Sequence, residues 1–248
     1  MKQALTWAAG GTLFLFAMTT LGAATVFLFA REPRERLRRW LLGFAAGIMT
    51  AASVWSLLLP AMDRAAALGL PPWLPATAGT GAGALFLWGL DALLPRLRPA
   101  SGRTSRETAL LVTAITLHNI PEGMAVGLSF ALAAGGEGFA AAALALGIGV
   151  QNFPEGAAVA LPLRQEGMRR SRAFALATLS GAVEPVFGIA AALMAAMAAA
   201  VMPWLLAFAA GAMLYVTAEE LLPQAQGGGA SAYLAGFLLM MLLDTALG

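Results

Sequence analysis

The chain contains no cysteine and only one histidine, His118, among its 248 residues. The absence of cysteine excludes disulfide bonds, thiolate metal ligands and thiol nucleophiles. A single histidine excludes the zinc proteases that hold their metal with two histidines in an H-E-x-x-H motif. Charged residues are also scarce, at 11%, whereas an average soluble domain has about 25%.

Hydrophobic residues make up 60% of the chain, and the mean hydropathy is +0.78. This composition is typical of a membrane protein. The formal net charge is +2 and the sequence pI is about 9.7. The basic residues lie in short loops between apolar runs and form no basic face, so nucleic-acid binding is not expected.

Eight apolar runs are long enough to cross a bilayer, which takes about 20 residues. The first run has no charge over 27 residues and exceeds the ~7–15-residue apolar core of a cleaved signal peptide. We therefore expect it to be retained, in an all-α membrane protein with a single transmembrane domain over residues 1–248. The predicted spans are about 4–30, 40–60, 73–94, 108–134, 139–163, 172–198, 203–223 and 231–247.

The distribution of basic residues predicts the orientation of this bundle in the membrane. Thirteen of the 15 lie in the loops after the first, third and fifth spans, and only Lys2 and Arg64 fall on the other side. The positive-inside rule then places these three loops in the cytoplasm and both termini outside it. Tryptophans near span ends fit the aromatic belts of a membrane protein. They are Trp7, Trp40, Trp73 and Trp204.

The fourth and fifth spans share an internal repeat, [His/Gln]-Asn-x-Pro-Glu-Gly. It reads HNIPEG at 118–123 and QNFPEG at 151–156. Both copies are equally far from the GGEG turn at 135–138, so antiparallel helices would bring them to one depth near the bilayer centre. Residues three and four apart share a helix face. The two faces consist of His118, Asn119 and Glu122, and of Gln151, Asn152 and Glu155.

Proline interrupts both copies of the repeat. Pro121 and Pro154 cannot donate to the carbonyl four residues earlier, so we predict a kink in each helix. Freed carbonyls are tolerated at membrane depth only where they face protein or a wet cavity. The glycine that ends each copy, Gly123 or Gly156, would admit a neighbouring helix or an ion.

Carboxylates in the middle of apolar spans are costly, at about 2.5–3.5 kcal/mol each on insertion scales. Besides the two repeat glutamates, Glu184 lies in the sixth span, in GAVEPVFG, and Glu219 and Glu220 lie in the seventh. No lysine or arginine lies in the interior of these spans. A bound cation or protonation must therefore neutralise them. Asp91 and Asp244 lie near span ends and are interpreted as solvated caps.

Imidazole, carboxylate and amide ligands together suit divalent metals of borderline softness. Calcium rarely binds histidine, and copper(I) prefers thiolate or several thioethers. Zinc fits best, and iron(II), manganese and cobalt remain alternatives. Met49, in the second span, would add a thioether from another helix, although simple packing also explains a methionine there.

Other interpretations of these buried polar residues remain to be weighed against a metal site. A Ser-His enzyme would lack the G-x-S-x-G turn that presents the nucleophile. A proton-coupled carrier of an organic solute would use the buried glutamates as proton relays, but it leaves the His and Gln at equivalent positions unexplained. A purely structural membrane protein leaves the buried carboxylates unexplained.

The two motifs and the eight-span topology resemble the ZIP (Zrt/Irt-like protein) metal transporters, in particular the prokaryotic branch, over essentially the whole chain. The resemblance implies a binuclear metal site between the fourth and fifth spans. Glu122 and Glu155 would bridge the two metals. One metal would be served by His118 and Gln151, with Met49 as an extra ligand, and the other by Asn119, Asn152 and Glu184.

The resemblance also implies uptake of divalent metal, zinc or alternatively cadmium, iron, manganese or cobalt, into the cytoplasm by an elevator-like motion. It implies a homodimer in the cell membrane, the inner membrane of a bacterium, with the metal as cargo and no cofactor. The family often has a His-Glu pair near the cytoplasmic exit. Here Glu219 and Glu220 stand in its place, so an exit-path metal site would be purely carboxylate. The family's His-rich loop is absent, because residues 95–107 are short and Arg-rich.

Overall fold

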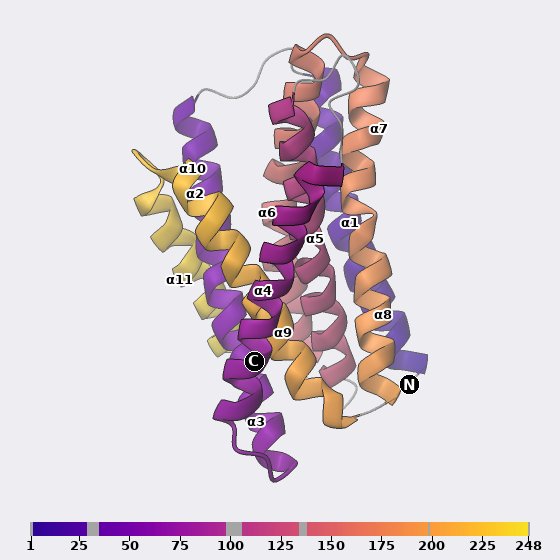
Figure 1. The fold of residues 1–248 in the computed structure, drawn as a ribbon, viewed down its shortest axis with the longest axis vertical. Helices are drawn as coiled ribbons and strands as arrows, with labels where there is room; N and C mark the ends of the chain where they lie inside the picture. The colour runs from indigo at the N-terminus through magenta and orange to yellow at the C-terminus, as the bar shows by residue number, and fades with distance from the viewer. Residues whose placement is uncertain (1, 29–34, 98–105, 134–137, 198, 248) are drawn as a thin grey trace.

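The computed structural model describes residues 2–28, 35–97, 106–133, 138–197 and 199–247. Every element in these ranges is helical, and the helices form eight segments that run roughly along one axis (Figure 1). The predicted all-helical fold with eight helices is confirmed. Four of the described segments are long and apolar enough to cross a membrane: Lys2–Leu28, Arg39–Ala67, Arg170–Ala195 and Met202–Ala225.

Some described segments are single helices and others are interrupted. The single helices are α1 (Lys2–Leu28), α4 (Trp73–Leu97), α5 (Arg106–Ala133), α6 (Gly138–Gln165) and α11 (Ala230–Leu247). The second segment consists of α2 (Glu35–Ala52), the π-helical η1 (Ser53–Leu58) and α3 (Leu59–Ala67). The sixth is α7 (Arg170–Gly181) followed by α8 (Val183–Met197). The seventh consists of the 3₁₀ turn η2 (Ala199–Val201), α9 (Met202–Val216), the π-helical η3 (Thr217–Leu221) and α10 (Leu222–Ala225).

The interruptions do not lie at the repeat prolines. α5 is one helix through Pro121, and α6 is one helix through Pro154, so a kink at these prolines stays a prediction. The π-helical stretches instead precede Pro60 and Pro223. A proline removes the N–H that would bond the carbonyl four residues back, and the wider π turn changes the bonding pattern just ahead of it.

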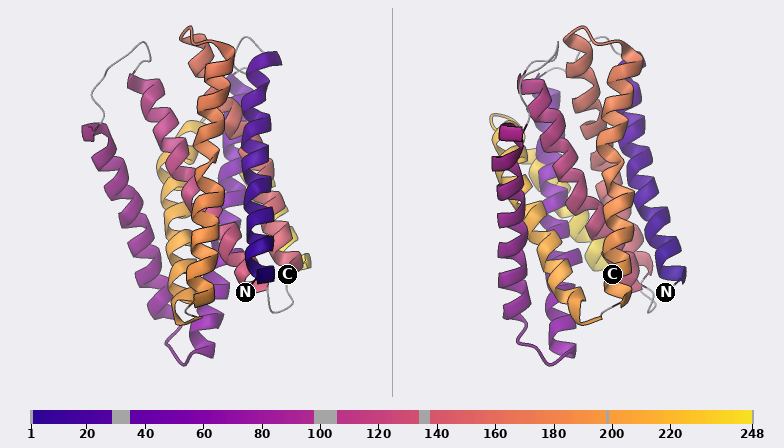
Figure 2. Two further views of the ribbon diagram at one scale, coloured as in Figure 1. Left: turned by 90° about the vertical axis from the view of Figure 1, so that its right-hand side faces the viewer. Right: turned by 45° about the vertical axis from the view of Figure 1, so that its right-hand side comes forward.

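The helices form two bundles. In the first bundle α1 packs on α6 and α5 packs on α8, with α7 alongside; in the second, α2 packs on α11 and α4 packs on α9, with α3 and α10 alongside. α1 and α4, one from each bundle, lie on opposite sides of the molecule (Figure 2). An apolar core that includes Met49, Leu128, Ile148 and Met213 joins the two bundles.

Contacts within a bundle differ in kind from contacts between the bundles. Within the second bundle, a Cβ on Gly47 would lie 2.0 Å from the carbonyl oxygen of Tyr233, and a Cβ on Gly83 would lie 2.0 Å from that of Phe208. Among the described glycines, only Gly147 of α6 faces the other bundle, and it meets a side chain there, the sulfur of Met240. At these glycines the helices of a bundle therefore touch backbone to backbone, whereas the apolar side chains of the shared core join the two bundles.

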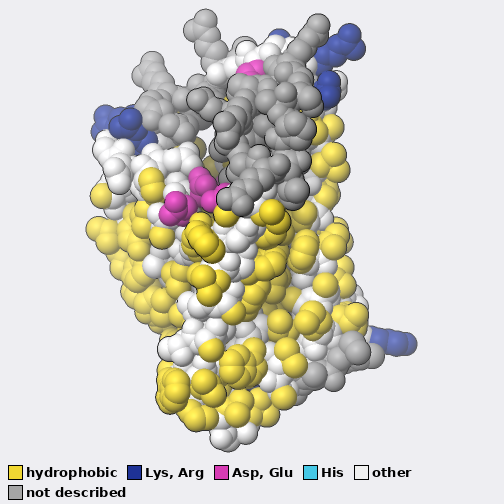
Figure 3. Space-filling model, viewed as in Figure 1, with side chains coloured by type: hydrophobic (Ala, Val, Ile, Leu, Met, Phe, Trp, Pro, Cys, Tyr) yellow, Lys and Arg dark blue, Asp and Glu magenta, His cyan; other side chains and the backbone are white. Residues whose placement is uncertain are grey.

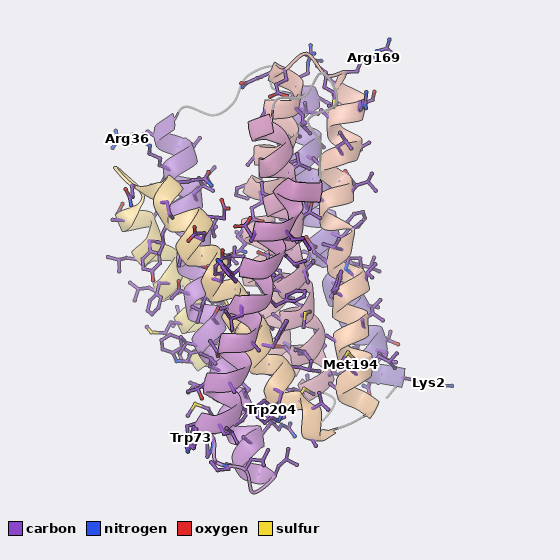
Figure 4. The ribbon with its side chains drawn as sticks, in the orientation of Figure 1. Lys2, Arg36, Trp73, Arg169, Met194 and Trp204 are labelled. Atoms are coloured by element: carbon purple, nitrogen blue, oxygen red, sulfur yellow. The ribbon has the colours of Figure 1, made fainter. Side chains whose placement is uncertain are left out.

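The two ends of the bundle differ in the residues that they carry. Arg36 and Arg169 lie at one end, and Lys2, Trp73 and Trp204 lie toward the other, where both termini are found (Figures 1 and 4). Hydrophobic side chains cover a broad band below the arginine-bearing end (Figure 3). This polarity agrees with the predicted topology, and the side of the membrane on which each end lies stays a prediction. Four of the arginines used for it lie outside the described residues: Arg31, Arg34, Arg98 and Arg103.

Candidate metal centre

The two copies of the repeat meet between α5 and α6. Gln151 donates a hydrogen bond from Nε2 to Oε1 of Glu122, with a separation of 2.5 Å. Both side chains are fully buried. The face of one copy therefore lies directly against the face of the other.

α8 adds a third carboxylate to these two motifs. The Oε1 atom of Glu184 accepts one hydrogen bond from Nδ2 of Asn152 and another from the hydroxyl of Thr19, both at 3.0 Å. Glu184 lies in the first turn of α8, where a helix N-terminus favours negative charge. Thr19 belongs to α1, so four helices of the first bundle converge on this point.

The break between α7 and α8 supplies a further partner. α7 ends at Gly181, and the last carbonyls of a helix have no partner within it. The carbonyl of Ser180 accepts a hydrogen bond of 2.9 Å from Nδ2 of Asn119. The first Asn of the repeat is thereby fixed to the backbone of α7.

The glycines that end the two repeats allow these approaches. A Cβ on Gly123 would lie 2.3 Å from the carbonyl oxygen of Glu184, and a Cβ on Gly156 would lie 2.0 Å from that of Thr19. Any side chain at either position would clash with backbone. Gly123 therefore allows the close approach of α8 to the site, and Gly156 allows that of α1.

The centre contains many buried oxygens and few donors. Buried polar atoms in proteins are nearly always hydrogen-bonded, yet seven side-chain oxygens of the candidate site have no partner. The three amide groups use their NH₂ atoms on protein acceptors, so only their oxygens are left over. The unpartnered atoms are Asn119 Oδ1, Glu122 Oε2, Gln151 Oε1, Asn152 Oδ1, Glu155 Oε1 and Oε2, and Glu184 Oε2.

The contacts given above do not include two of the predicted ligands, His118 and Met49. The backbone of His118 belongs to α5, and its side chain lies outside the described part of the chain. Met49 is fully buried in the apolar core on α2, and its role as a ligand stays a prediction. Among the described side chains, no three of the types His, Cys, Asp and Glu group closely enough to hold a metal ion alone. A cation here would therefore need the amide oxygens as well.

Glu219 and Glu220 form a separate acidic group in η3. Asp91 of α4 lies near Glu220 and Tyr215, and Gln224 donates a 3.4 Å hydrogen bond to Glu220. α10, which follows η3, lies toward the arginine-bearing end of the molecule (Figure 1). This group is partly exposed, in contrast to the buried centre.

The interpretation of Asp244 as a solvated cap is wrong. Ser56 of η1 donates a 2.6 Å hydrogen bond to its Oδ1 atom, and its Oδ2 atom is buried without a partner. The π-helical stretch turns Ser56 toward α11, and a sequence pattern based on α-helical periodicity does not anticipate this.

Sequence reasoning missed two participants in the buried centre, the hydroxyl of Thr19 and the carbonyl of Ser180. The break next to Ser180 had a signal, because Gly181 and Pro185 flank Glu184. Thr19 had none, since α1 contains several threonines and no motif.

Comparison with known proteins agrees with this architecture. Residues 96–244 match the family model described as ZIP Zinc transporter. The chain is 34% identical to zinc transporter ZIP11 of Homo sapiens, over 96% of each chain. It is 40% identical to zinc transporter ZIPB of Bordetella bronchiseptica, over 94% of this chain and 79% of that one. It is also 40% identical to zinc transporter GufA of Myxococcus xanthus, over 93% and 94% of the two chains. The chain therefore belongs to the ZIP zinc transporter family.

Proposed function

We propose that the protein carries divalent metal ions, zinc foremost, across the cell membrane into the cytoplasm. The observation that carries the proposal is the set of seven buried, unpartnered oxygens contributed by both repeats and by α8. Acceptors without donors at membrane depth call for a cation. The relatives named as zinc transporters support zinc as that cation.

The proposed site holds two metal ions. Glu122 and Glu155 bridge them, as the matching positions of the family imply. His118, Gln151 and Met49 would serve one ion, and the amide oxygens of Asn119 and Asn152 with Oε2 of Glu184 would serve the other. Carboxylate, amide and imidazole ligands suit zinc, iron(II), manganese or cobalt. The metal is cargo in this proposal, and the chemistry is binding and release rather than catalysis.

Transport by an elevator-like motion draws support from the way the helices pack. The proposed ligands other than Met49 of α2 lie on α5, α6 and α8, which all belong to the first bundle. Glycines allow backbone contacts within each bundle, and apolar side chains of a shared core join the two bundles. The first bundle is thus suited to slide as a body against the second, carrying the metal with it.

The proposed route ends at the arginine-bearing side. The acidic group of Asp91, Glu219 and Glu220 would receive the ion on its way to the cytoplasm, with carboxylates in place of the family's usual His-Glu pair. We further propose, on the family's pattern, that the protein works as a homodimer in the inner membrane of a bacterium.

Uptake into liposomes tests the proposal. Purified protein would be reconstituted, and influx of zinc, cadmium, iron(II) and manganese followed with an encapsulated metal-sensitive dye. Glu122→Gln and Glu155→Gln should reduce zinc influx to near the rate of empty liposomes, whereas Glu166→Gln, in the exposed turn after α6, should transport normally. Full zinc influx in both site variants would reject the site, and metal-independent solute flux would favour the organic-solute carrier.

A further inference from the structure

We propose that Thr19 of α1 is a positioning residue of the metal site, one that holds Glu184 in place as a single-oxygen ligand. The inference rests on the proposed function and names a side chain outside both repeats. Its hydroxyl lies 3.0 Å from Oε1 of Glu184, closer than the 3.3 Å to the carbonyl oxygen of Leu15, and the Thr19 side chain is buried.

The two donors on Glu184 divide the roles of its oxygens. Thr19 and Asn152 both donate to Oε1, while Oε2 is buried and has no partner. A carboxylate oxygen with two donors is a poorer metal ligand than its free neighbour, since its lone pairs are already engaged. Oε2 is therefore the atom offered to the metal, and the carboxylate plane is fixed by α1 and α6 together.

The backbone around Thr19 is built for this contact. A Cβ on Gly181 would lie 2.9 Å from the Thr19 methyl group, and a Cβ on Gly156 would lie 2.0 Å from the Thr19 carbonyl oxygen. In return, a Cβ on Gly22 would lie 1.9 Å from the carbonyl oxygen of Phe153. α1 thus touches α6 backbone to backbone on either side of Glu155, which leaves Thr19 little freedom to move away from the site.

The repeat supports the same assignment. Gly123 of the first copy packs against the backbone of Glu184, and Gly156 of the second copy packs against the backbone of Thr19. Each copy therefore places one additional side chain beside the buried centre. The first is a ligand, and the second is the residue that orients this ligand.

Three substitutions distinguish the loss of the hydroxyl donor from a change in side-chain shape. Thr19→Val keeps the shape and removes the donor, Thr19→Ala removes the donor without any new atoms near Gly181, and Thr19→Ser keeps the donor. Thr12→Val is the matched control, because Thr12 is equally buried on the same helix but donates only to the backbone oxygens of Ala8 and Ala9.

Zinc titration of the purified proteins in detergent, together with uptake rates against zinc concentration, gives the readout. A hydrogen bond to a charged group is worth enough to change an equilibrium constant about ten- to hundred-fold. We expect Thr19→Val and Thr19→Ala to raise Kd and KM for zinc by roughly tenfold, because the Asn152 donor remains. Thr19→Ser should bind within about threefold of the parent, and Thr12→Val should match the parent.

A double-mutant cycle links the effect to Glu184. In a Glu184→Gln background, Thr19→Val should cause no further loss of zinc affinity. The inference is overturned if Thr19→Ser loses as much affinity as Thr19→Val, or if Thr19→Val binds zinc like Thr12→Val. It is also overturned if the loss persists unchanged in the Glu184→Gln background. Absence of zinc binding by the parent protein would instead reject the proposed function, so the two failures are distinguishable.

Discussion

The amides of the proposed metal centre are each held in one orientation by their own NH₂ group. Gln151 donates to Glu122, Asn152 to Glu184 and Asn119 to the carbonyl of Ser180. A flipped amide would place its oxygen against another acceptor, which is repulsive, so the bonded orientation is favoured. The buried amide oxygens are therefore left without a donor, as acceptors that a cation could use, before any ion arrives.

Glu155 offers a direct test of this arrangement, because both of its oxygens are buried without a donor. Leaving such a group unsatisfied costs about 1–3 kcal/mol or more. We expect Glu155→Gln to raise the melting temperature of the metal-free protein, because an amide supplies donors to the surrounding oxygens. The same variant should lose the stabilisation that zinc gives the parent, which is about 2.7 kcal/mol at a hundredfold excess over Kd. Thermal unfolding in detergent with and without zinc measures both, and a lower melting temperature for the metal-free variant would contradict the prediction.

Acidity should weaken zinc binding. The occupied site holds fewer protons than the empty one, because metal and protons compete for the same carboxylate and imidazole atoms. Lowering the pH therefore favours the empty site. We expect the Kd for zinc to rise steadily from about pH 8 to about pH 5, the range over which such ligands gain protons. Calorimetric titration in matched buffers measures this, and a flat Kd would argue against these ligands.

At the scale of single helices, glycine contacts decide how closely α1 and α8 approach the repeats. Gly156→Ala would place a methyl group against the backbone of Thr19. Overpacking of this kind typically costs about 1–3 kcal/mol. We expect a lower melting temperature and weaker zinc binding. Gly10→Ala is the control, because a Cβ there meets nothing within 4 Å, and a helix gains up to about 1 kcal/mol from this exchange. Equal behaviour of the two variants would contradict the assigned role of Gly156.

Much of this element-level picture was predictable from sequence. Long apolar runs marked the eight segments, and the helical period placed Glu122 and Gln151 on faces that the structure brings together. The π-helical stretches were not predictable. Pro60 and Pro223 lie within apolar spans, as Pro121 and Pro154 do, yet the helices continue as α-helices through the latter two. The contact of Thr19 with Glu184 joins residues 165 positions apart, and no local pattern encodes such a distance.

At the scale of the molecule, the two bundles are expected to move relative to each other. The chain has no cysteine, so introduced pairs are the only thiols. Gly147→Cys with Met240→Cys would link α6 to α11 across the bundles. Phe86→Cys with Phe208→Cys would link α4 to α9 within one bundle, where the parent rings lie 5.4 Å apart. A short thiol-reactive cross-linker should stop zinc uptake in the first pair and spare it in the second. Continued uptake after complete cross-linking of the first pair would contradict relative motion of the bundles.

The bond from Asn119 to Ser180 has one more consequence. It is made to the main chain, so it does not depend on which amino acid occupies position 180. Replacing Ser180 by another small residue would leave this acceptor in place, so such a variant would not reveal the contact. Part of the proposed metal centre is thus formed by main-chain atoms, whose contribution the exchange of side chains does not test.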